Sequence, residues 1–197
     1  MNLPNKITVA RIILSVIVLV LLMIPWYSLG VYWPEYLVGN VTVSLKYIVA
    51  GILFAIAAFT DFLDGHLARK YNMVTDFGKV TDAIADKLLV NGVLIILAYE
   101  RSIMLIVPVI IISRDIIVDS LKMLSGSKGK VVAASKLGKI KTVFMLVGLT
   151  LVFFYNLPFE LLNLPVADLL LLLATLFSVI SGCQYYYNCK KYLFANM

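Results

Sequence analysis

The chain has few charged residues, a single histidine and only two cysteines. Charged residues make up 14% of 197, whereas a soluble domain carries about 25%. With 62% hydrophobic residues and a mean hydropathy of +0.98, this composition excludes a water-soluble globule. Cys183 and Cys189 lie six apart on one predicted helix, too far for a disulfide, and we expect reduced apolar filler.

Long apolar runs predict six transmembrane helices, because each approaches the ~20 residues needed to cross the hydrocarbon of a bilayer. No repeat or low-complexity tract divides them, so we expect an all-α polytopic membrane protein with one domain over residues 1–197. The predicted helices cover Ile7–Ile24, Leu45–Thr60, Ala83–Tyr99, Ile103–Leu124, Ile140–Tyr155 and Val166–Tyr187.

The distribution of basic residues predicts the orientation. A cytoplasmic N-terminus places 13 of the 17 bases in the cytoplasm, in accord with the positive-inside rule. Both termini are then cytoplasmic, and the aromatic loop from Trp26 to Tyr36 lies at the outer surface of the plasma membrane. Anionic membrane lipids are a sufficient partner for the net charge of +6, and we expect no nucleic acid.

The most informative pattern is D-x-x-D-G-x-x-A-R-x8-G-x3-D-x3-D, which begins at Asp61. Spacings of three and four put the carboxylates on two helical faces that converge across a short loop. Four such carboxylates repel one another unless a cation lies between them, and an all-oxygen set favours Mg²⁺ or Mn²⁺. Small residues leave room for a ligand, and Arg69 suits a phosphate, so the pattern indicates a nucleotide diphosphate site. The eight positions are Asp61, Asp64, Gly65, Ala68, Arg69, Gly78, Asp82 and Asp86.

His66 lies between these positions. On a helix its side chain projects about 100° from that of Gly65, and we expect a structural or lipid-interface role.

The pattern resembles the signature of the CDP-alcohol phosphotransferases, integral membrane enzymes of phospholipid synthesis. The resemblance extends from Leu3 to Thr142 and includes the opening Leu3-Pro4-Asn5-Lys6-Ile7-Thr8 and Arg11. The stretch from Ser113-Arg114-Asp115 to Thr142 is similar to the branch that makes phosphatidylglycerophosphate.

The resemblance implies a reaction and the residues that perform it. CDP-diacylglycerol would bind at Asn5, Thr8, Gly65, Ala68, Arg69 and Gly78. A binuclear Mg²⁺ or Mn²⁺ centre would be held by Asp61, Asp64, Asp82 and Asp86. Glycerol 3-phosphate would attack the β-phosphorus, with Asp86 taking its proton. The resemblance also implies a homodimer.

Charges inside the fourth predicted helix need a separate explanation, since each costs about 2.5–3.5 kcal/mol at depth. Asp115, Asp119 and Lys122 are spaced to pair along one face, whereas Arg114 points elsewhere and is a candidate for an anionic ligand. Lys136 and Lys139 either bind that ligand or only anchor the helix at the inner surface. The resemblance favours binding, because in that family a basic pocket in this region receives the phosphate of the acceptor.

Three alternatives stay open. The acceptor alcohol could be inositol phosphate or serine instead of glycerol 3-phosphate. The carboxylates could form a divalent-cation transport path, although a transporter would place polar residues near mid-membrane on several helices. The first apolar run could also be a cleavable signal peptide, which would discard Asn5 and Thr8.

Overall fold

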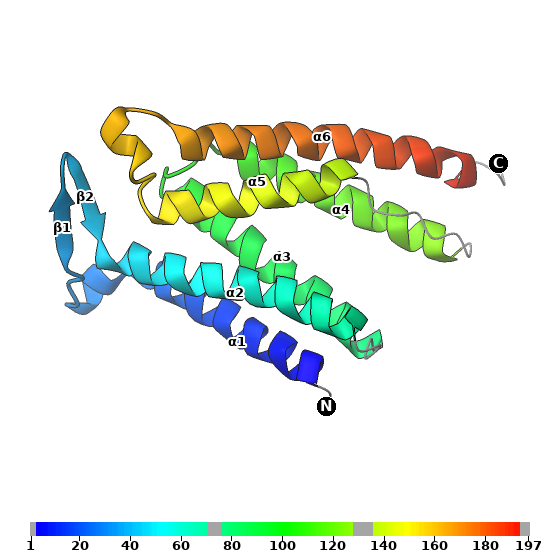
Figure 1. Cartoon of the computed structure of the whole chain (residues 1–197), viewed down its shortest axis with the longest axis horizontal. Helices are drawn as coiled ribbons and strands as arrows, with labels where there is room; N and C mark the ends of the chain where they lie inside the picture. The colour runs from blue at the N-terminus through cyan, green and yellow to red at the C-terminus, as the bar shows by residue number, and fades with distance from the viewer. Residues whose placement is uncertain (1–2, 71–75, 128–135, 194–197) are drawn as a thin grey trace.

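The computed structural model describes residues 3–70, 76–127 and 136–193; within these helices the side chains of residues 3–5, 62–70, 76–77, 79–80 and 191–193 are outside the description. Six α-helices account for most of this part of the chain, as the apolar runs predict (Figure 1). They are α1 (Leu3–Met23), α2 (Leu45–Lys70), α3 (Asp76–Tyr99), α4 (Ile106–Ser127), α5 (Lys136–Phe153) and α6 (Val166–Leu193).

A two-stranded hairpin joins α1 to α2, and the hydropathy pattern did not predict it. Strand β1 (Glu35–Val38) pairs antiparallel with β2 (Val41–Ser44), Glu35 opposite Ser44. The turn between the strands contains Gly39 at φ +61°, a conformation that glycine adopts without strain. Short 3₁₀ helices, η1 (Trp26–Leu29) and η2 (Phe159–Leu162), lie at the same end of the molecule (Figure 1).

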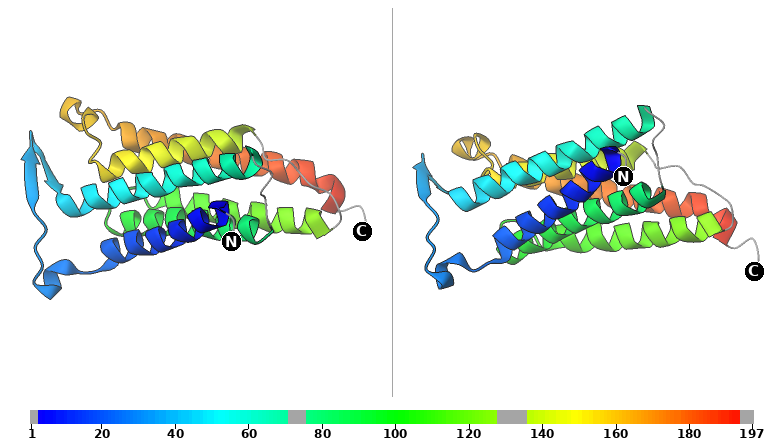
Figure 2. Two further views of the ribbon diagram at one scale, coloured as in Figure 1. Left: turned by 60° about the horizontal axis from the view of Figure 1, so that its bottom comes forward. Right: turned by 90° about the horizontal axis from the view of Figure 1, so that it is seen from below.

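The helices form two groups. In one, α1 packs against both α2 and α3; in the other, α6 packs against α4 and α5, and α2 contacts α5 between the groups. Figure 2 shows α1 crossing between α2 and α3. One hydrophobic core runs through both groups and contains Phe54 of α2, Leu94 of α3, Ile111 of α4 and Phe153 of α5. The two aromatic rings lie 5.5 Å apart.

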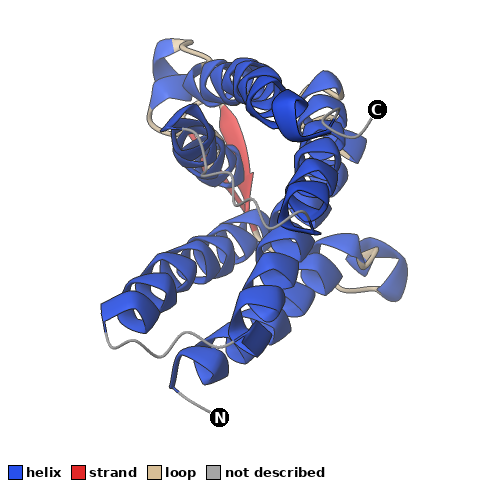
Figure 3. Cartoon of the chain, turned by 90° about the vertical axis from the view of Figure 1, so that its right-hand side faces the viewer, coloured by secondary structure: helices blue, strands red, loops and turns tan. Residues whose placement is uncertain are grey.

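The start of α1 and the end of α6 lie opposite the hairpin (Figure 1). Figure 3 views the molecule from that end, with the hairpin behind the helices. We call it the acid end, because Asp61 lies in the second half of α2 and Asp82 and Asp86 lie in the first half of α3. The start of α1 and the end of α6 lie on this same side, and the cytoplasmic location of that side stays a prediction.

The exterior of the helices is rich in apolar side chains. Ile17, Ile56, Ile95, Val143 and Leu176, one from each of α1, α2, α3, α5 and α6, are all exposed. Within the described residues, two helices are long and apolar enough to cross a membrane by composition alone: α1 over Lys6–Met23 and α6 over Val166–Lys190. Of the other four helices, α3, α4 and α5 contain charged residues well within their apolar runs, and several of these charges pair with one another.

Candidate functional site

The start of α1 links the two aspartate-bearing helices at the acid end. Arg11 of α1 forms an ion pair with Asp61 of α2, and its guanidinium is buried, with 1% of the side chain exposed. One turn earlier, Thr8 donates a hydrogen bond to Asp82 Oδ1 of α3 at 2.6 Å. The N-terminal segment is therefore part of the site, which argues against the signal-peptide alternative for this helix.

The described part of the chain leaves some predicted residues untested. The side chains of Asn5, Asp64 and Arg69 lie outside the described residues, as do the surroundings of Gly65, His66 and Ala68. Gly78 is buried on α3, one turn before Asp82. The predicted nucleotide slot beside Gly65, Ala68 and Gly78 stays a prediction.

The donor chemistry of the acid end fits a hard divalent cation. Asp61 interacts electrostatically with Asp82, and Asp86 with Asp61, so the three carboxylates share one region. Arg11 supplies one positive charge near these three carboxylates. Bound cations would balance the negative charge that remains. Among the described side chains, no group of three or more is arranged to hold a metal ion. Asp64, three residues after Asp61 on the α2 backbone, is the fourth member that the motif requires.

A basic cavity of about 270 Å³ lies beside the aspartates and is built mainly from α3, α4 and α5. Five basic and three acidic side chains line it, which leaves a formal charge of +2. Such a charge matches a phosphate monoester, which carries nearly two negative charges at neutral pH. The bases are Lys87, Arg114, Lys122, Lys139 and Lys141, and the acids are Asp86, Asp115 and Asp119.

Arg114 and Lys139, two of the three predicted acceptor residues, line this cavity together, whereas Lys136 is not among the lining residues. Their role in binding the acceptor stays a prediction. Lys136 is exposed at the first position of α5, one turn before Lys139 and Ile140. Its membership in the acceptor site stays a prediction. Anchoring of the helix at the inner membrane surface accounts for its position equally well.

The expectation that Arg114 points away from Asp115 is wrong. Arg114 Nη1 donates to Asp115 Oδ1 at 2.9 Å, and Nη2 donates to Ser181 Oγ of α6 at 2.7 Å. Arg114 Nε donates to the Ser178 carbonyl at 3.1 Å. A Cβ on Gly182 would lie 3.0 Å from Arg114 Cγ, so glycine leaves room for the arginine stem between α4 and α6. Three of the five guanidinium N–H donors thus have described partners, and these hydrogen bonds hold the guanidinium group of Arg114 in place.

Sequence reasoning missed Lys141, which is the main partner of Asp115. Lys141 Nζ donates to both Asp115 oxygens at 2.8 Å and is 5% exposed. The expected pairing of Asp115 with Lys122 is absent from the described contacts, whereas Lys122 pairs with Asp119 at 3.4 Å as predicted. A signal for Lys141 was available: it lies four residues before Met145, on the buried stripe of α5.

Lys87 of α3 forms an ion pair with Asp119 of α4. Asp119 therefore joins two lysines from different helices, since it also pairs with Lys122. Six charges of α3, α4 and α5 are consequently joined by ion pairs around the basic cavity: Lys87, Arg114, Asp115, Asp119, Lys122 and Lys141. Burial of unpaired charges in lipid is avoided, and the paired helices can still lie within a membrane.

Asp86 joins the two parts of the site. It lines the basic cavity, and it interacts electrostatically with Asp61 and Arg11 on one side and with Asp115 and Lys141 on the other. A group in this position lies between the acidic region and the cavity that is charged to hold a phosphate. It is therefore placed to act on both.

Of the two cysteines, Cys189 is buried and accepts a hydrogen bond from Ser125 at 3.4 Å, whereas Cys183 is exposed. Both are free, as predicted, although only Cys189 fills the interior.

Comparison with known proteins assigns this arrangement to a class. The family model of CDP-alcohol phosphatidyltransferases matches residues 1–181. The chain belongs to this family of membrane enzymes, as the motif at Asp61 predicts.

Relatives that align with nearly the whole chain share one name, CDP-diacylglycerol–glycerol-3-phosphate 3-phosphatidyltransferase. The protein from Bacillus subtilis (strain 168) is 43% identical over 185 residues, which cover 94% of this chain and 93% of the relative. The protein from Rickettsia felis is 34% identical over 97% of both chains. That from Haemophilus influenzae is 31% identical over 100% of this chain and 97% of its own.

Proposed function

We propose that the chain transfers the phosphatidyl group of CDP-diacylglycerol to glycerol 3-phosphate, giving phosphatidylglycerophosphate and CMP. The structural observation that supports a phosphorylated acceptor is the basic cavity beside Asp86, with its formal charge of +2. The names of relatives that cover nearly the whole chain support the same reaction.

The acceptor is held through its phosphate in the basic cavity. Arg114 is fixed by Asp115 and Ser181, so its remaining N–H donors present a rigid fork. Lys139 and Lys141 add charge from the start of α5. A serine acceptor has no phosphate and would leave this charge unmatched, whereas inositol phosphate would match it. Asp86 lines the same cavity, so the hydroxyl of an acceptor held there would lie beside this carboxylate.

The acid end holds the nucleotide-lipid. Asp61, Asp64, Asp82 and Asp86 are the residues that would hold Mg²⁺ or Mn²⁺, which when bound neutralises the pyrophosphate and stabilises the departing CMP. Arg11 keeps Asp61 in place and Thr8 keeps Asp82 in place, so the carboxylates of two helices are fixed before substrate arrives.

The chemical step needs no protein nucleophile. The sn-1 hydroxyl oxygen of glycerol 3-phosphate bonds to the β-phosphorus of CDP-diacylglycerol as the bond from that phosphorus to the bridging oxygen breaks. CMP leaves with the bridging oxygen, and Asp86 takes the hydroxyl proton. Positioning and charge stabilisation provide most of the rate enhancement in phosphoryl transfer.

The proposed setting is a multi-pass protein of the plasma membrane, with six helices crossing and the acid end in the cytoplasm. The exposed apolar side chains on the helices and the excess of basic residues at the acid end support this orientation. Labelling single cysteines with a membrane-impermeant reagent tests it. In a background without Cys183 and Cys189, Asn40→Cys in the hairpin turn should react from outside in intact cells, and Ser127→Cys should react only after permeabilisation. The reverse pattern would invert the topology. A homodimer also stays a prediction, which cross-linking in native membranes tests.

The function is tested by offering purified protein CDP-diacylglycerol with glycerol 3-phosphate, inositol phosphate or serine, and measuring CMP. Release that depends on glycerol 3-phosphate supports the proposal. Release with another alcohol alone would reassign the acceptor. Metal flux in proteoliposomes without CMP release would favour the transporter alternative.

A further inference from the structure

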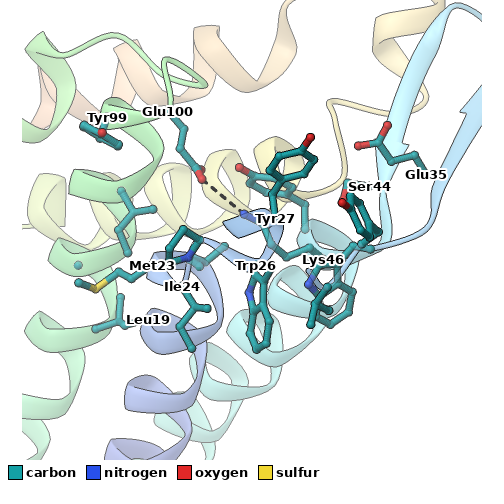
Figure 4. A pocket seen from close by; sticks show the side chains of 18 of the residues that line it. Leu19, Met23, Ile24, Trp26, Tyr27, Glu35, Ser44, Lys46, Tyr99 and Glu100 are labelled. Atoms are coloured by element: carbon teal, nitrogen blue, oxygen red, sulfur yellow. Dashed lines mark ion pairs between the residues drawn. The ribbon is translucent and has the colours of Figure 1, made fainter. Parts of the chain in front are cut away.

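Two cavities of the molecule differ in the sign of their charge. The one at the hairpin end, of about 1280 Å³, has mostly apolar and aromatic walls, and its charged side chains are Glu35, Lys46 and Glu100 (Figure 4). Lys46 pairs with Glu100 at 3.6 Å, and the lining carries a formal charge of −1. Such a charge repels a phosphate. The ion pairs that bear on phosphate binding are therefore those of the basic cavity beside the aspartates.

One group of ion pairs in the basic cavity is held firmly. Its centre is Asp115, which accepts from Arg114 at 2.9 Å and from Lys141 at 2.8 Å. The Lys141 side chain is only 5% exposed, and Arg114 also donates to Ser178 and Ser181 of α6. Removing Asp115 from its two cations would leave buried charge without a partner, which is costly. This group therefore stays intact when a ligand binds.

The second group is held much less firmly. The carboxylate of Asp119 pairs with Lys87 of α3 through one oxygen and lies 3.4 Å from Lys122 Nζ through the other. The side chains of Lys87, Asp119 and Lys122 are 44%, 31% and 51% exposed. Among the described residues, no second carboxylate forms an ion pair with either lysine. Because water and salt screen exposed ion pairs, they contribute little to stability, and this group can rearrange at small cost.

A phosphate in the cavity would need the same two lysines. Lys87, Asp119 and Lys122 all line the cavity, so a ligand can reach them. A phosphate monoester carries nearly two negative charges on three acceptor oxygens. Each ammonium has three N–H donors and could reach both anions, but a carboxylate beside a phosphate is repelled by it. Charge-assisted hydrogen bonds to phosphate also outweigh an exposed ion pair. The phosphate should therefore replace the carboxylate.

We propose that Asp119 competes with the phosphate of the acceptor for Lys87 and Lys122, and so sets the affinity of the site. The proposal rests on the proposed function. Asp119 holds both lysines until the phosphate takes them, and its partly exposed side chain then turns toward water. Phosphatidylglycerophosphate, the product, keeps the phosphate of the acceptor. The return of Asp119 to the two lysines therefore also favours release of the product.

Kinetics of an Asp119→Asn variant test the competition. The purified protein in nanodiscs is assayed for CMP release at saturating CDP-diacylglycerol, with glycerol 3-phosphate varied and inorganic phosphate as a competitive inhibitor. Asparagine keeps the shape of the side chain and removes its charge. We expect the KM for glycerol 3-phosphate and the inhibition constant of phosphate to fall together by about threefold to tenfold, the value of two exposed ion pairs. The KM for CDP-diacylglycerol should stay within twofold.

Two controls separate competition from a general change of charge. Asp168→Asn removes an acid in the first turn of α6, outside the basic cavity, and should change none of these constants. The second control places Asp119→Asn in a Lys87→Met/Lys122→Met background. With no lysine left to compete for, the substitution should no longer tighten phosphate binding, whereas a general charge effect would persist unchanged. If the triple variant fails to fold, Lys122→Met alone serves, and the tightening should be about half as large on a logarithmic scale.

The possible outcomes are distinct. Weaker binding in Asp119→Asn would overturn the proposal, because the carboxylate would then position the lysines for the phosphate. Unchanged binding, or equal tightening with and without the lysines, would overturn it as well. In each of these cases CMP release still depends on glycerol 3-phosphate, so the proposed function survives. Absence of that dependence in the unmodified protein would overturn both.

Discussion

Lys141 Nζ donates hydrogen bonds to both oxygens of Asp115, 26 residues away on the neighbouring helix, each at 2.8 Å. Asp115 also accepts from Arg114, so one carboxylate orients two cations of the basic cavity. The pair therefore has two separable effects, one on stability and one on acceptor binding.

Lys141→Met should reduce stability by about 2–3 kcal/mol, less than the 3–5 kcal/mol of a fully buried pair because Arg114 remains beside Asp115. It should also raise the KM for glycerol 3-phosphate about tenfold, with little change for CDP-diacylglycerol. The double variant Asp115→Asn/Lys141→Met should recover most of the Tm, since no carboxylate is left unpaired. Its KM for glycerol 3-phosphate should stay high. Recovery of both quantities would show that the pair is only structural.

Lys139 and Lys136 form a matched comparison, because both are exposed lysines in the first turn of α5 and only Lys139 lines the cavity. Lys139→Ala should raise the KM for glycerol 3-phosphate about tenfold, as expected for a lost phosphate contact. Lys136→Ala should change it less than twofold, by about 0.4 kcal/mol or less. Steady-state kinetics with each substrate varied in turn measures both values. Equal effects of the two substitutions would mean that the lysines act through general charge.

Thr8→Val tests the contribution of α1 to the carboxylates. The substitution keeps the shape of the side chain and removes the hydrogen bond to Asp82, which is worth about 1.5–3 kcal/mol when the acceptor is charged. We expect turnover to fall by about tenfold or more at a fixed Mg²⁺ concentration. Thr60→Val is the control, since the Thr60 hydroxyl donates to the backbone of its own helix beside Asp61. Similar losses in both variants would assign the effect to helix packing.

Metal dependence follows from the four carboxylates of the motif. Activity should disappear in excess EDTA and return with Mg²⁺ or Mn²⁺, because the four acidic positions of the motif supply only oxygen donors. Asp61→Asn and Asp82→Asn should each abolish turnover by removing a ligand. Full activity in EDTA would refute the metal centre. Binding of Mn²⁺ followed by electron paramagnetic resonance supplies a readout that does not depend on turnover.

Asp86 should behave differently from the other carboxylates if it accepts the hydroxyl proton. Asp86→Asn should keep most CDP-diacylglycerol binding and reduce kcat by about 10²–10⁴, the usual contribution of a positioned general base. Asp61→Asn, its control, should weaken metal and nucleotide-lipid binding together. Turnover and binding are measured across a Mg²⁺ titration for both variants. Rescue of Asp86→Asn by added metal would reject the base assignment and leave Asp86 as a ligand.

The six helices and the motif at Asp61 could be read from the sequence, because both are local patterns. Apolar runs specify helices in a membrane, where every backbone polar group needs an internal partner. Spacings of three and four specify which residues share a helical face. The hairpin at Glu35–Ser44 escaped prediction, since its strands are four residues each and too short to show an alternating pattern.

Pairings between helices were decided only by the tertiary structure. The sequence placed Arg114, Asp115, Asp119 and Lys122 on one helix, and local spacing correctly paired Asp119 with Lys122. It could not show that Lys141 reaches Asp115, or that Ser178 and Ser181 of α6 fix Arg114. The same holds for Arg11 with Asp61 and Thr8 with Asp82, partners 50 and 74 residues apart. Such contacts depend on how whole helices pack against one another. Helix packing is set by the combined fit of many side chains along each interface, and the residue spacing within one helix does not determine it.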